Sequence, residues 1–500
     1  MPVAITYSSA EVGIDAPLVT VEVDVSPGLP QVLIVGMAET AVRESKDRIR
    51  AAYRSCGLKF PDKRITVNLA PADLPKAGGR YDLAIAIAIL AANGEIEGRQ
   101  LARHEFLGEL SLTGELRGVS GVLPAAVRPG GRSRRLIVPL ANADEAALSP
   151  DAHVFTSEDL TGVISYLNDG ASLPAATRAK TEAPVLSGPG FDDVRGQEAA
   201  KRALMIAAAG GHNLLMVGPP GTGKTMLANR LPALLPALSQ AEALEVASIV
   251  SVSGHAMDTA RWRQRPFRAP HHTTSAVALV GGSRPPKPGE ISLAHHGVLF
   301  LDELPEFPRR VLEVLREPLE SGEIWISRAG RQVRFPARFQ LIAAMNPCPC
   351  GHYGDMPKQC ECPPDQVERY RTRLSGPLLD RIDLQVQVPR PAEGTLRGGA
   401  RPSRDQDARL KVERARSRAL TRQGNRNSDL AGKQLEQHCQ LQAEDEALLE
   451  NAVSRLGLSV RGYFRVLRVA RTIADLDNQA KISASELLEA LSYRSVIGKG

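Results

Sequence analysis

The stretch Gly218-Pro219-Pro220-Gly221-Thr222-Gly223-Lys224-Thr225 decides how this chain folds. It follows an apolar run at 213–217 that is typical of a buried parallel strand, and it precedes a helical pattern at 226–231. A glycine-rich loop between a strand and a helix turns its backbone N–H groups toward phosphate oxygens, and the helix N-terminus adds a positive dipole end. Lys224 can then reach the β- and γ-phosphates, and the Thr225 hydroxyl can bind Mg²⁺. The stretch predicts a nucleotide site.

Two acidic residues provide the two carboxylates that ATP hydrolysis would need, one for Mg²⁺ and one for the attacking water. The apolar strand at 297–301 ends in Asp302 and Glu303. Such a strand places Asp302 beside the phosphate loop, where its carboxylate can hold Mg²⁺. Glu303 is then positioned to orient and polarise the attacking water. The loop and the acidic pair together predict an ATPase with ATP and Mg²⁺ in its site.

Length and composition set wider bounds. Five hundred residues correspond to roughly two to four domains. The 62 Lys and Arg against 56 Asp and Glu give a net charge of +6, which is compatible with a nucleic-acid partner or with an ordinary solvated surface. The longest apolar run, 83–92, is about half the length that spans a bilayer, and no charged leader is visible. We therefore expect a cytoplasmic protein with no membrane partner.

The N-terminal third alternates short strand patterns with helical patterns. We expect strands at 21–25, 31–36 and 65–71 and helices at 40–53 and 83–92. This alternation predicts an α/β or α+β domain.

Two segments of this region, 75–83 and 112–121, resemble the landmarks of Lon-type protease domains, whose fold is similar to a ribosomal-protein domain (ribosomal S5 domain 2-like). In those proteases the first segment carries a nucleophilic serine and the second is followed by a lysine base. Here Arg80 stands at the serine position, and no lysine occurs at 129–131. A serine–lysine dyad needs both groups, so the resemblance implies a protease fold without protease activity. Lys76, Arg80 and Arg117 are candidate DNA contacts, with a plain solvated face as the alternative.

A second resemblance begins after a Pro-, Ala- and Ser-rich linker. The segment 191–197 is similar to the sequence that packs against adenine in AAA+ ATPases, which assigns that role to Val194 and Gln197. A third strand, 339–345, ends in Asn346, the position of the polar AAA+ sensor. The segment 375–383 resembles the arginine-finger segment, so Arg381 would reach the γ-phosphate of a neighbouring subunit. A finger supplied by a neighbour implies a ring, usually a hexamer.

Two insertions indicate which group of AAA+ ATPases the chain resembles. Residues 266–296 look like the insertion of magnesium-chelatase ATPase subunits, and they contain two pairs of adjacent histidines. Adjacent residues of an extended chain face opposite ways, which weighs against metal binding by these pairs. Residues 323–335 predict a hairpin with Arg328 and Arg331 at its tip. Ring helicases thread a similar hairpin into the pore to grip the phosphate backbone of DNA; a solvated turn is the alternative.

Four of the six cysteines cluster as two Cys-x-Cys pairs, at Cys348, Cys350, Cys360 and Cys362. This spacing suits a tetrahedral Zn²⁺ site, with His352 as a substitute ligand. Four thiolates leave no open coordination position, so the zinc would be structural.

The C-terminal part predicts a helical lid. Its segment 460–468 places Phe464 and Leu467 on an apolar face. By resemblance, Arg461 is the second arginine sensor for the ATP phosphates, often acting on a neighbouring subunit. We expect Arg465 and Arg468 to be solvated.

Nearly the whole chain is similar to the YifB/ComM family of magnesium-chelatase-like proteins. The resemblance divides the chain into a Lon-protease-like α+β domain at 1–173, a linker at 174–190, an AAA+ core with a parallel sheet at 191–390, and a helical lid at 391–500. It implies a hexameric, ATP-driven DNA translocase that promotes branch migration in natural transformation, with single-stranded and branched DNA and a recombinase as partners. The first alternative is a magnesium-chelatase motor subunit. The second is an ATP-dependent protease, which is disfavoured because Arg80 stands at the position of the catalytic serine.

Overall fold

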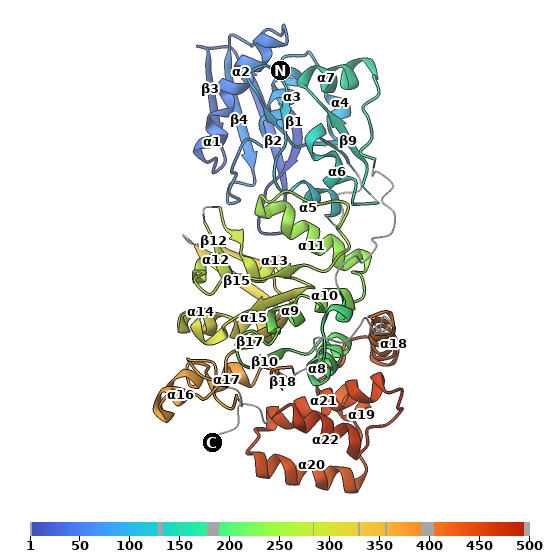
Figure 1. The fold of residues 1–500 in the computed structure, drawn as a ribbon. Helices are drawn as coiled ribbons and strands as arrows, with labels where there is room; N and C mark the ends of the chain where they lie inside the picture. Colours follow the sequence, from blue (N-terminus) through green and yellow to red (C-terminus); the bar gives the residue numbers. More distant parts are fainter. Residues whose placement is uncertain are drawn as a thin grey trace.

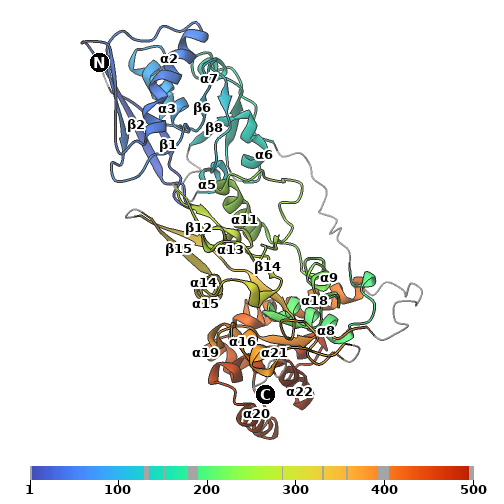
Figure 2. The ribbon, with the colours of Figure 1, turned by 60° about the vertical axis from the view of Figure 1, so that its left-hand side comes forward.

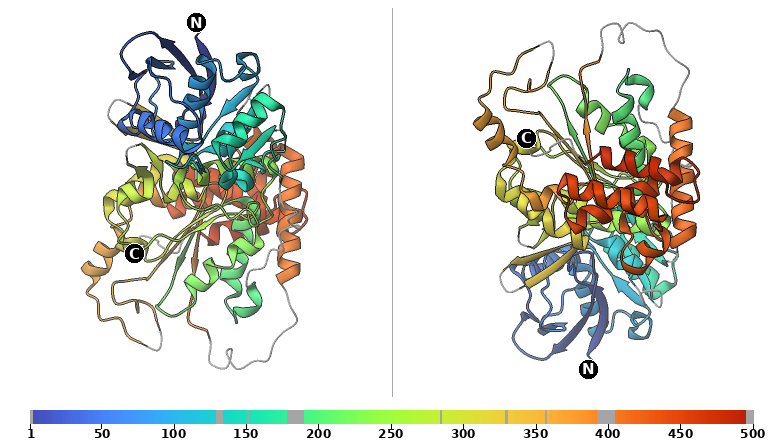
Figure 3. Two further views of the ribbon diagram at one scale, coloured as in Figure 1. Left: turned by 90° about the horizontal axis from the view of Figure 1, so that it is seen from above. Right: turned by 90° about the horizontal axis from the view of Figure 1, so that it is seen from below.

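The computed structural model shows three tiers along one axis: an N-terminal α/β tier, a central parallel sheet and a C-terminal group of helices (Figure 1). Seen from below, the C-terminal helices lie in front and the N-terminal sheet lies behind (Figure 3). The structure describes residues 3–128, 134–150, 152–177, 190–283, 285–328, 331–355, 358–391 and 405–494.

The N-terminal tier is built around a four-stranded sheet in the order β1-β2-β4-β3. Its strands are β1 (Ala4–Ser9), β2 (Leu18–Ser26), β3 (Gln31–Val35) and β4 (Arg64–Ala70). Burial alternates along β2, because the helix α3 (Asp82–Ala92) covers one face of the sheet. Every predicted strand of this tier is present, and the predicted helix at 40–53 is split at Glu44 into α1 (Thr40–Arg43) and α2 (Ser45–Ser55).

A second sheet in this tier is parallel, in the order β5-β8-β9. Its elements, with the neighbouring short pieces, are α4 (Gly98–Leu101), β5 (His104–Phe106), β6 (Glu109–Leu110), β7 (Leu116–Arg117), α5 (Val122–Val127), β8 (Arg135–Pro139), α6 (Ala143–Ala146), β9 (Val154–Ser157) and α7 (Leu160–Asp169). The backbone N–H of Ala176 donates to Val154. The tier therefore extends a few residues past 173, into the predicted linker; residues 178–189 lie outside the described ranges.

The central sheet has five parallel strands in the order β11-β14-β17-β10-β18. These are β10 (Leu214–Val217), β11 (Phe267–Arg268), β14 (Val298–Leu301), β17 (Gln340–Met345) and β18 (Leu384–Gln387). Leu214 and Met216 pack into the core beneath α8 (Glu198–Gly210), whereas Leu215 and Val217 join the core on the other face. Both faces are covered, which is why these strands are continuous apolar runs in the sequence.

The insertions project from this sheet. The hairpin of β15 (Glu323–Arg328) and β16 (Arg331–Pro336) is antiparallel, with Arg328 opposite Arg331, as predicted. Its turn at 329–330 and the side chains of both arginines lie outside the described part of the structure. The other elements of this tier are α9 (Lys224–Ala228), α10 (Leu231–Leu234), α11 (Gln240–Ser253), α12 (Ala276–Val280), β12 (Gly281–Gly282), β13 (Lys287–Pro288), α13 (Glu290–Leu293), α14 (Arg309–Val314), α15 (Arg316–Ser321), α16 (Pro364–Arg371) and α17 (Gly376–Leu379).

The C-terminal tier contains α18 (Asp405–Gln423), α19 (Gly432–His438), α20 (Ala443–Leu456), α21 (Val460–Leu476) and α22 (Ala484–Ser492). Leu467 is buried as predicted, but Phe464 is 39% exposed. The prediction that Arg465 and Arg468 are solvated is wrong. Arg465 donates to Asp383 of the central tier at 2.8 Å, and Arg468 donates to the Leu430 carbonyl within the C-terminal tier at 2.7 Å, so each guanidinium has a protein partner.

These tiers confirm a mixed α/β fold with parallel sheets and a helical C-terminus. Within the described ranges, none of the helices combines the length and the apolar character that crossing a membrane requires.

Candidate nucleotide site

The phosphate loop connects β10 to α9 and is closed by its own lysine. Gly221 and Gly223 have φ of +77° and +89°, which side chains with a Cβ rarely adopt. The Lys224 ammonium donates to the carbonyls of Gly218 (2.6 Å) and Pro219 (2.9 Å) and to Oδ1 of Asn346 (3.1 Å). Burial lowers the pKa of Lys224, and nearby Asp302 and Glu303 act against this shift. The predicted phosphate-binding lysine, Lys224, and the predicted sensor, Asn346, are therefore in direct contact.

The acidic pair lies at the same edge of the sheet, after β14. The hydroxyl of Thr225 donates to Oδ2 of Asp302 at 2.6 Å. A hydroxyl and a carboxylate are oxygen ligands of the kind that Mg²⁺ prefers, so Thr225 and Asp302 fit the ion. Glu303 has a φ of +51°, and its side chain is 52% exposed. The two predicted metal ligands therefore meet, and Glu303 stays accessible.

One residue beside this pair was not predicted. The Nδ1 atom of His272 lies 3.3 Å from a carboxylate oxygen of Glu303. His272 belongs to the loop after β11, and its partner is far away in the sequence. Neither spacing nor residue type could have revealed this contact.

The candidate adenine contacts lie on the approach to α8. Val194 is buried in the core. Gln197, at the N-terminus of α8, has a φ of +60° and donates its amide to the carbonyl of Pro389 at 2.6 Å. Its second contact, at 3.4 Å, is the carbonyl of Thr222 in the phosphate loop. Both residues thus lie on a segment that contacts the loop.

The two arginines expected at the phosphates are not at this edge of the sheet. Arg381 precedes β18, whereas Lys224 follows β10, and these strands are parallel neighbours. The ends of the sheet are therefore separated by about 13 Å, the length of a four-residue strand. Arg381 is buried and pairs with Glu320, and Arg461 lies 4.0 Å from the same carboxylate. Neither arginine can reach the nucleotide bound by its own Lys224.

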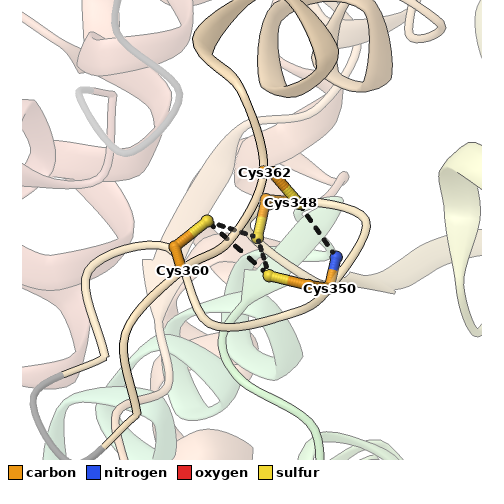
Figure 4. Close-up of side chains that lie close together, drawn as sticks. All are labelled: Cys348, Cys350, Cys360 and Cys362. Carbon is orange, nitrogen blue, oxygen red and sulfur yellow. Dashed lines mark hydrogen bonds between the residues drawn. The ribbon is translucent and has the colours of Figure 1, made fainter.

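The four clustered cysteines converge after β17 (Figure 4). The sulfur of Cys348 lies 3.3 Å from that of Cys350 and 3.6 Å from that of Cys360, and all four sulfurs lie within 4.8 Å of one another. Sulfurs around a tetrahedral zinc are about 3.8 Å apart, given Zn–S bonds of about 2.3 Å. The donor set therefore fits Zn²⁺. His352 pairs with Asp355 instead of joining the set.

This cysteine loop touches the phosphate loop. Gly351 has a φ of +84°, and a Cβ at this position would lie 2.6 Å from a ring carbon of Pro220. Only a glycine lets the two loops approach this closely. The cysteine loop thus packs against the phosphate loop from the side.

The pair His295 and His296 does not behave as expected. The rings of His295 and His296 are 3.9 Å apart, and both contact Glu245, at 3.0 and 2.9 Å. The prediction that they face opposite ways is wrong, because His296 has a φ of +54° and its chain is not extended. Nδ1 of His295 accepts from the backbone of Arg338 at 3.0 Å. Its Nε2 must then carry the proton that Glu245 accepts, which leaves no lone pair on that nitrogen for a metal.

The basic residues proposed as DNA contacts in the N-terminal tier also need correction. Lys76 is fully buried and bonds the carbonyl of Pro71, and Arg80 is 4% exposed and pairs with Glu11 at 3.3 Å. Neither forms a solvated or DNA-binding face. Arg117 is exposed. Residues 129–131, where a protease would carry its lysine, lie outside the described ranges.

Comparisons with known proteins agree with this geometry. Family models described as "Magnesium chelatase, subunit ChlI", "Subunit ChlI of Mg-chelatase" and "Magnesium chelatase, subunit ChlI C-terminal" match residues 190–396, 21–142 and 403–494. The competence protein ComM of Haemophilus influenzae is 51% identical, over 99% of this chain and 98% of its own length. The Escherichia coli protein YifB, which is uncharacterized, is 48% identical over the same shares. The magnesium-chelatase 38 kDa subunit of Rhodobacter capsulatus is 28% identical, over 64% of this chain and 91% of its own length.

The fold and the site define a phosphate-loop ATPase of the magnesium-chelatase type, a class of AAA+ ATPases that uses ATP and Mg²⁺. Within that class, identity close to one half along the whole length shows that the chain belongs to the YifB/ComM family.

Proposed function

We propose that this protein is a hexameric, ATP-driven DNA helicase that promotes branch migration of recombination intermediates in natural transformation. The observation that carries the proposal is the position of Arg381 and Arg461 at the edge of the sheet opposite the phosphate loop. A complete site then needs a second copy of the chain, and a ring of copies is the closed arrangement in which every site is complete.

At each subunit boundary, different residues would bind ATP, bind Mg²⁺ and promote hydrolysis. Gly218 to Thr225 hold the phosphates of ATP, Val194 and Gln197 the adenine, and Thr225 with Asp302 the Mg²⁺. Bound Mg²⁺ supplies neutralisation of the phosphate charge. Glu303 accepts the proton of the attacking water and Asn346 aligns that water. Arg381 and Arg461 of the neighbouring copy would stabilise the charge of the transition state.

The hairpin of β15 and β16 is the candidate DNA contact. Arg328 and Arg331 are paired at the turn end of its two strands. Figure 2 shows the hairpin projecting from the central tier. Two guanidinium groups at the end of a narrow hairpin can follow a phosphate backbone without reading bases. The ComM relative is a competence protein, which is in keeping with DNA as the substrate. Single-stranded and branched DNA in the cytoplasm, with a recombinase, are the partners that this function would require.

The other parts of the chain have supporting roles in this proposal. The four cysteines would hold a structural Zn²⁺ that stiffens the loop against Pro220. Residues 1–173 would form a Lon-protease-like domain without its dyad, residues 191–390 the AAA+ core and residues 391–500 the lid. Arg80, at the position that the resemblance aligns with the protease nucleophile, is buried in an ion pair, and we propose no peptide cleavage by this domain.

The second candidate is a magnesium-chelatase motor subunit, which the match to the Rhodobacter capsulatus protein favours. That match covers 64% of this chain and so leaves about a third of it unmatched. The 51% identity to the competence protein ComM over 99% of this chain weighs in favour of the first proposal.

Forked and three-way DNA junctions with ATP provide the test. We expect DNA to stimulate hydrolysis and the protein to displace a strand, and Lys224→Ala to abolish both. Replacing Arg328 and Arg331 by alanine should remove strand displacement while hydrolysis without DNA persists. If the parent protein shows neither DNA-stimulated hydrolysis nor strand displacement, the helicase proposal is refuted.

A further inference from the structure

A short turn of the N-terminal tier packs onto the arginine hairpin. Residues 12–15, here called the docking turn, are closed by reciprocal backbone hydrogen bonds between Val12 and Asp15, both 3.0 Å long. The turn projects from the end of β1 toward the central tier. In Figure 2 the hairpin lies beneath the lower end of the N-terminal sheet.

The contact between the turn and the hairpin is close. Gly13 has a φ of +61°, and a Cβ at this position would lie 2.8 Å from Cγ1 of Val333 and 2.9 Å from the carbonyl of Arg334. Val12 and Ile14, on either side, pack against the apolar cluster that contains Val333. Such packing leaves no room between the turn and β16. The contact lies only a few residues from Arg331 at the hairpin tip.

A buried ion pair holds the turn in place. Glu11, the residue before the turn, accepts from Arg80 at 3.3 Å and from the hydroxyl of Ser120 at 2.7 Å. The Arg80 side chain is only 5% exposed, and it also donates to the carbonyl of Gly121 at 3.4 Å. A guanidinium this deeply buried needs its carboxylate, because an unpaired charge is costly to remove from water. The position of Glu11 is therefore tied to the body of the domain.

The same domain also contacts the core at a second place. The backbone N–H of Gly121 donates to the carbonyl of Ser251 in α11 at 3.2 Å, and Leu123 of α5 packs with Ala243 and Ala247 of that helix. Arg80, Glu11 and Gly121 thus form a connected path from α11 to the docking turn. Motion of the core can reach the hairpin through the N-terminal tier as well as through β15 itself.

We propose that Arg80 is a positioning residue, which fixes the docking turn through Glu11 and so sets the position of the β15–β16 hairpin relative to the core. This inference rests on the proposed role of that hairpin in DNA translocation. Arg80, which the resemblance aligns with the protease serine, would thus have a mechanical role. Through the docking turn, the N-terminal tier would keep the hairpin in position while a DNA strand pulls on it.

The test compares Arg80→Met and Gly13→Ala with the parent protein. Arg80→Met removes the charge that holds Glu11. Gly13→Ala leaves the domain core untouched and places a Cβ against Val333. In both variants we expect faster hydrogen exchange of the β15 and β16 amides. Strand displacement should fall about fivefold at equal ATP hydrolysis without DNA, within the range of coupling carried by packed contacts. Arg80→Lys, which keeps the charge, should recover part of both effects.

Arg48→Met is the matched control. It breaks another ion pair of the same tier, between Arg48 and the buried Asp82 at 2.7 Å. Among the described residues, the other hydrogen bonds of this pair go to the backbone of Ala41 and Leu110 and not to the docking turn. We expect it to leave the exchange of the hairpin amides unchanged. If Arg80→Met and Gly13→Ala leave that exchange at the parent value, the positioning role is refuted. The exchange measurement needs no DNA, so this failure is distinct from a failure of the helicase proposal itself.

Discussion

At the scale of single residues, the nucleotide site depends on opposite charges that follow two strands, β10 and β14, on either side of β17. Lys224 would be an unfavourable buried cation without Asp302 and Glu303 nearby, and Asp302 is already engaged by Thr225. Glu303 alone keeps an exposed carboxylate, with His272 beside it. The side chain that would orient the attacking water in the proposed mechanism is thus the one that the fold leaves accessible.

Glu303→Gln should separate ATP binding from hydrolysis. Glutamine keeps the size of the side chain but cannot accept the proton of the water, so we expect the turnover number to fall by roughly 10²–10⁴. Affinity for ATP should change little, because Lys224 and Thr225 remain. Phosphate release and binding of a fluorescent ATP analogue measure the two quantities. Glu306→Gln, at a nearby exposed ion pair with Arg373, is the control and should keep its turnover. Normal turnover in Glu303→Gln would remove this residue from the mechanism.

At the scale of elements, two contacts connect the central sheet and its phosphate loop to neighbouring segments. The cysteine loop packs against the phosphate loop through Gly351 and Pro220. On the opposite edge, Asp383 at the start of β18 binds Arg465 of α21 and accepts from the backbone N–H of Asn213 at 3.0 Å. The first connection supports the phosphates, and the second fixes the C-terminal helices to the sheet.

Cys360→Ser tests the first connection. Removing one of four thiolates should reduce bound zinc from about one ion per chain to near zero, since structural sites use four ligands. We also expect slower ATP hydrolysis, because the loop beside Pro220 loses its cross-link. Metal analysis by mass spectrometry gives the primary result. Cys56→Ser, outside the cluster, should retain its metal. Equal zinc contents in the two variants would argue against the site.

Asp383→Asn tests the second connection through its pH dependence. Burial alone would raise the pKa of Asp383, but His212 and Arg465 outweigh it and hold that pKa below its usual range. A carboxyl whose pKa is lowered in the folded state stabilises the fold above its unfolded pKa of about 3.9, and this contribution disappears as the pH falls below that value. We expect Asp383→Asn to lose about 2 kcal/mol at pH 7.

The difference between parent and variant should shrink below about pH 4, where the unfolded chain begins to bind the proton. Urea unfolding of both proteins across a pH series gives this difference, and carboxyls common to both cancel. A difference that stays constant down to pH 3 would contradict the assignment.

At the scale of the whole molecule, the proposed ring would make each chain contribute to two different sites. The phosphate loop is on one edge of the sheet, whereas Arg381 and Arg461 are on the other, beside a cavity of about 1310 Å³ that Arg381 and Asp383 line. In the single chain, Glu320 binds Arg381 and lies 4.0 Å from Arg461. A neighbouring copy with bound ATP would compete with Glu320 for these guanidinium groups.

Mixed subunits test this division. Lys224→Ala should lose hydrolysis, and Arg381→Ala should lose on the order of 10³ in rate. In an equal mixture, about a quarter of the boundaries would pair an intact loop with an intact arginine, because each boundary joins unlike surfaces of two chains. We therefore expect the mixture to recover measurable ATP hydrolysis. Each variant alone at the same total concentration is the control, and a mixture no more active than its parts would contradict a shared site.

The sequence by itself determined the local parts of this protein. The phosphate loop, the acidic pair, the third strand with Asn346 and the two Cys-x-Cys pairs are contiguous motifs, so the chemistry of each follows from residue type and spacing. Strands buried on both faces are recognisable as apolar runs for the same reason. The parallel sheet then brings the ends of separate strands to one edge, as expected.

Only the tertiary structure decided which distant groups meet. It buried Lys76 and Arg80, turned His295 and His296 to the same carboxylate, and set Arg381 beside Arg461 and Glu320. It also brought the docking turn onto the arginine hairpin. These outcomes depend on a local backbone angle, such as the φ of +54° at His296, and on packing between segments far apart in the chain. Spacing along a sequence carries neither kind of information, because burial and charge pairing are settled when the tiers pack together.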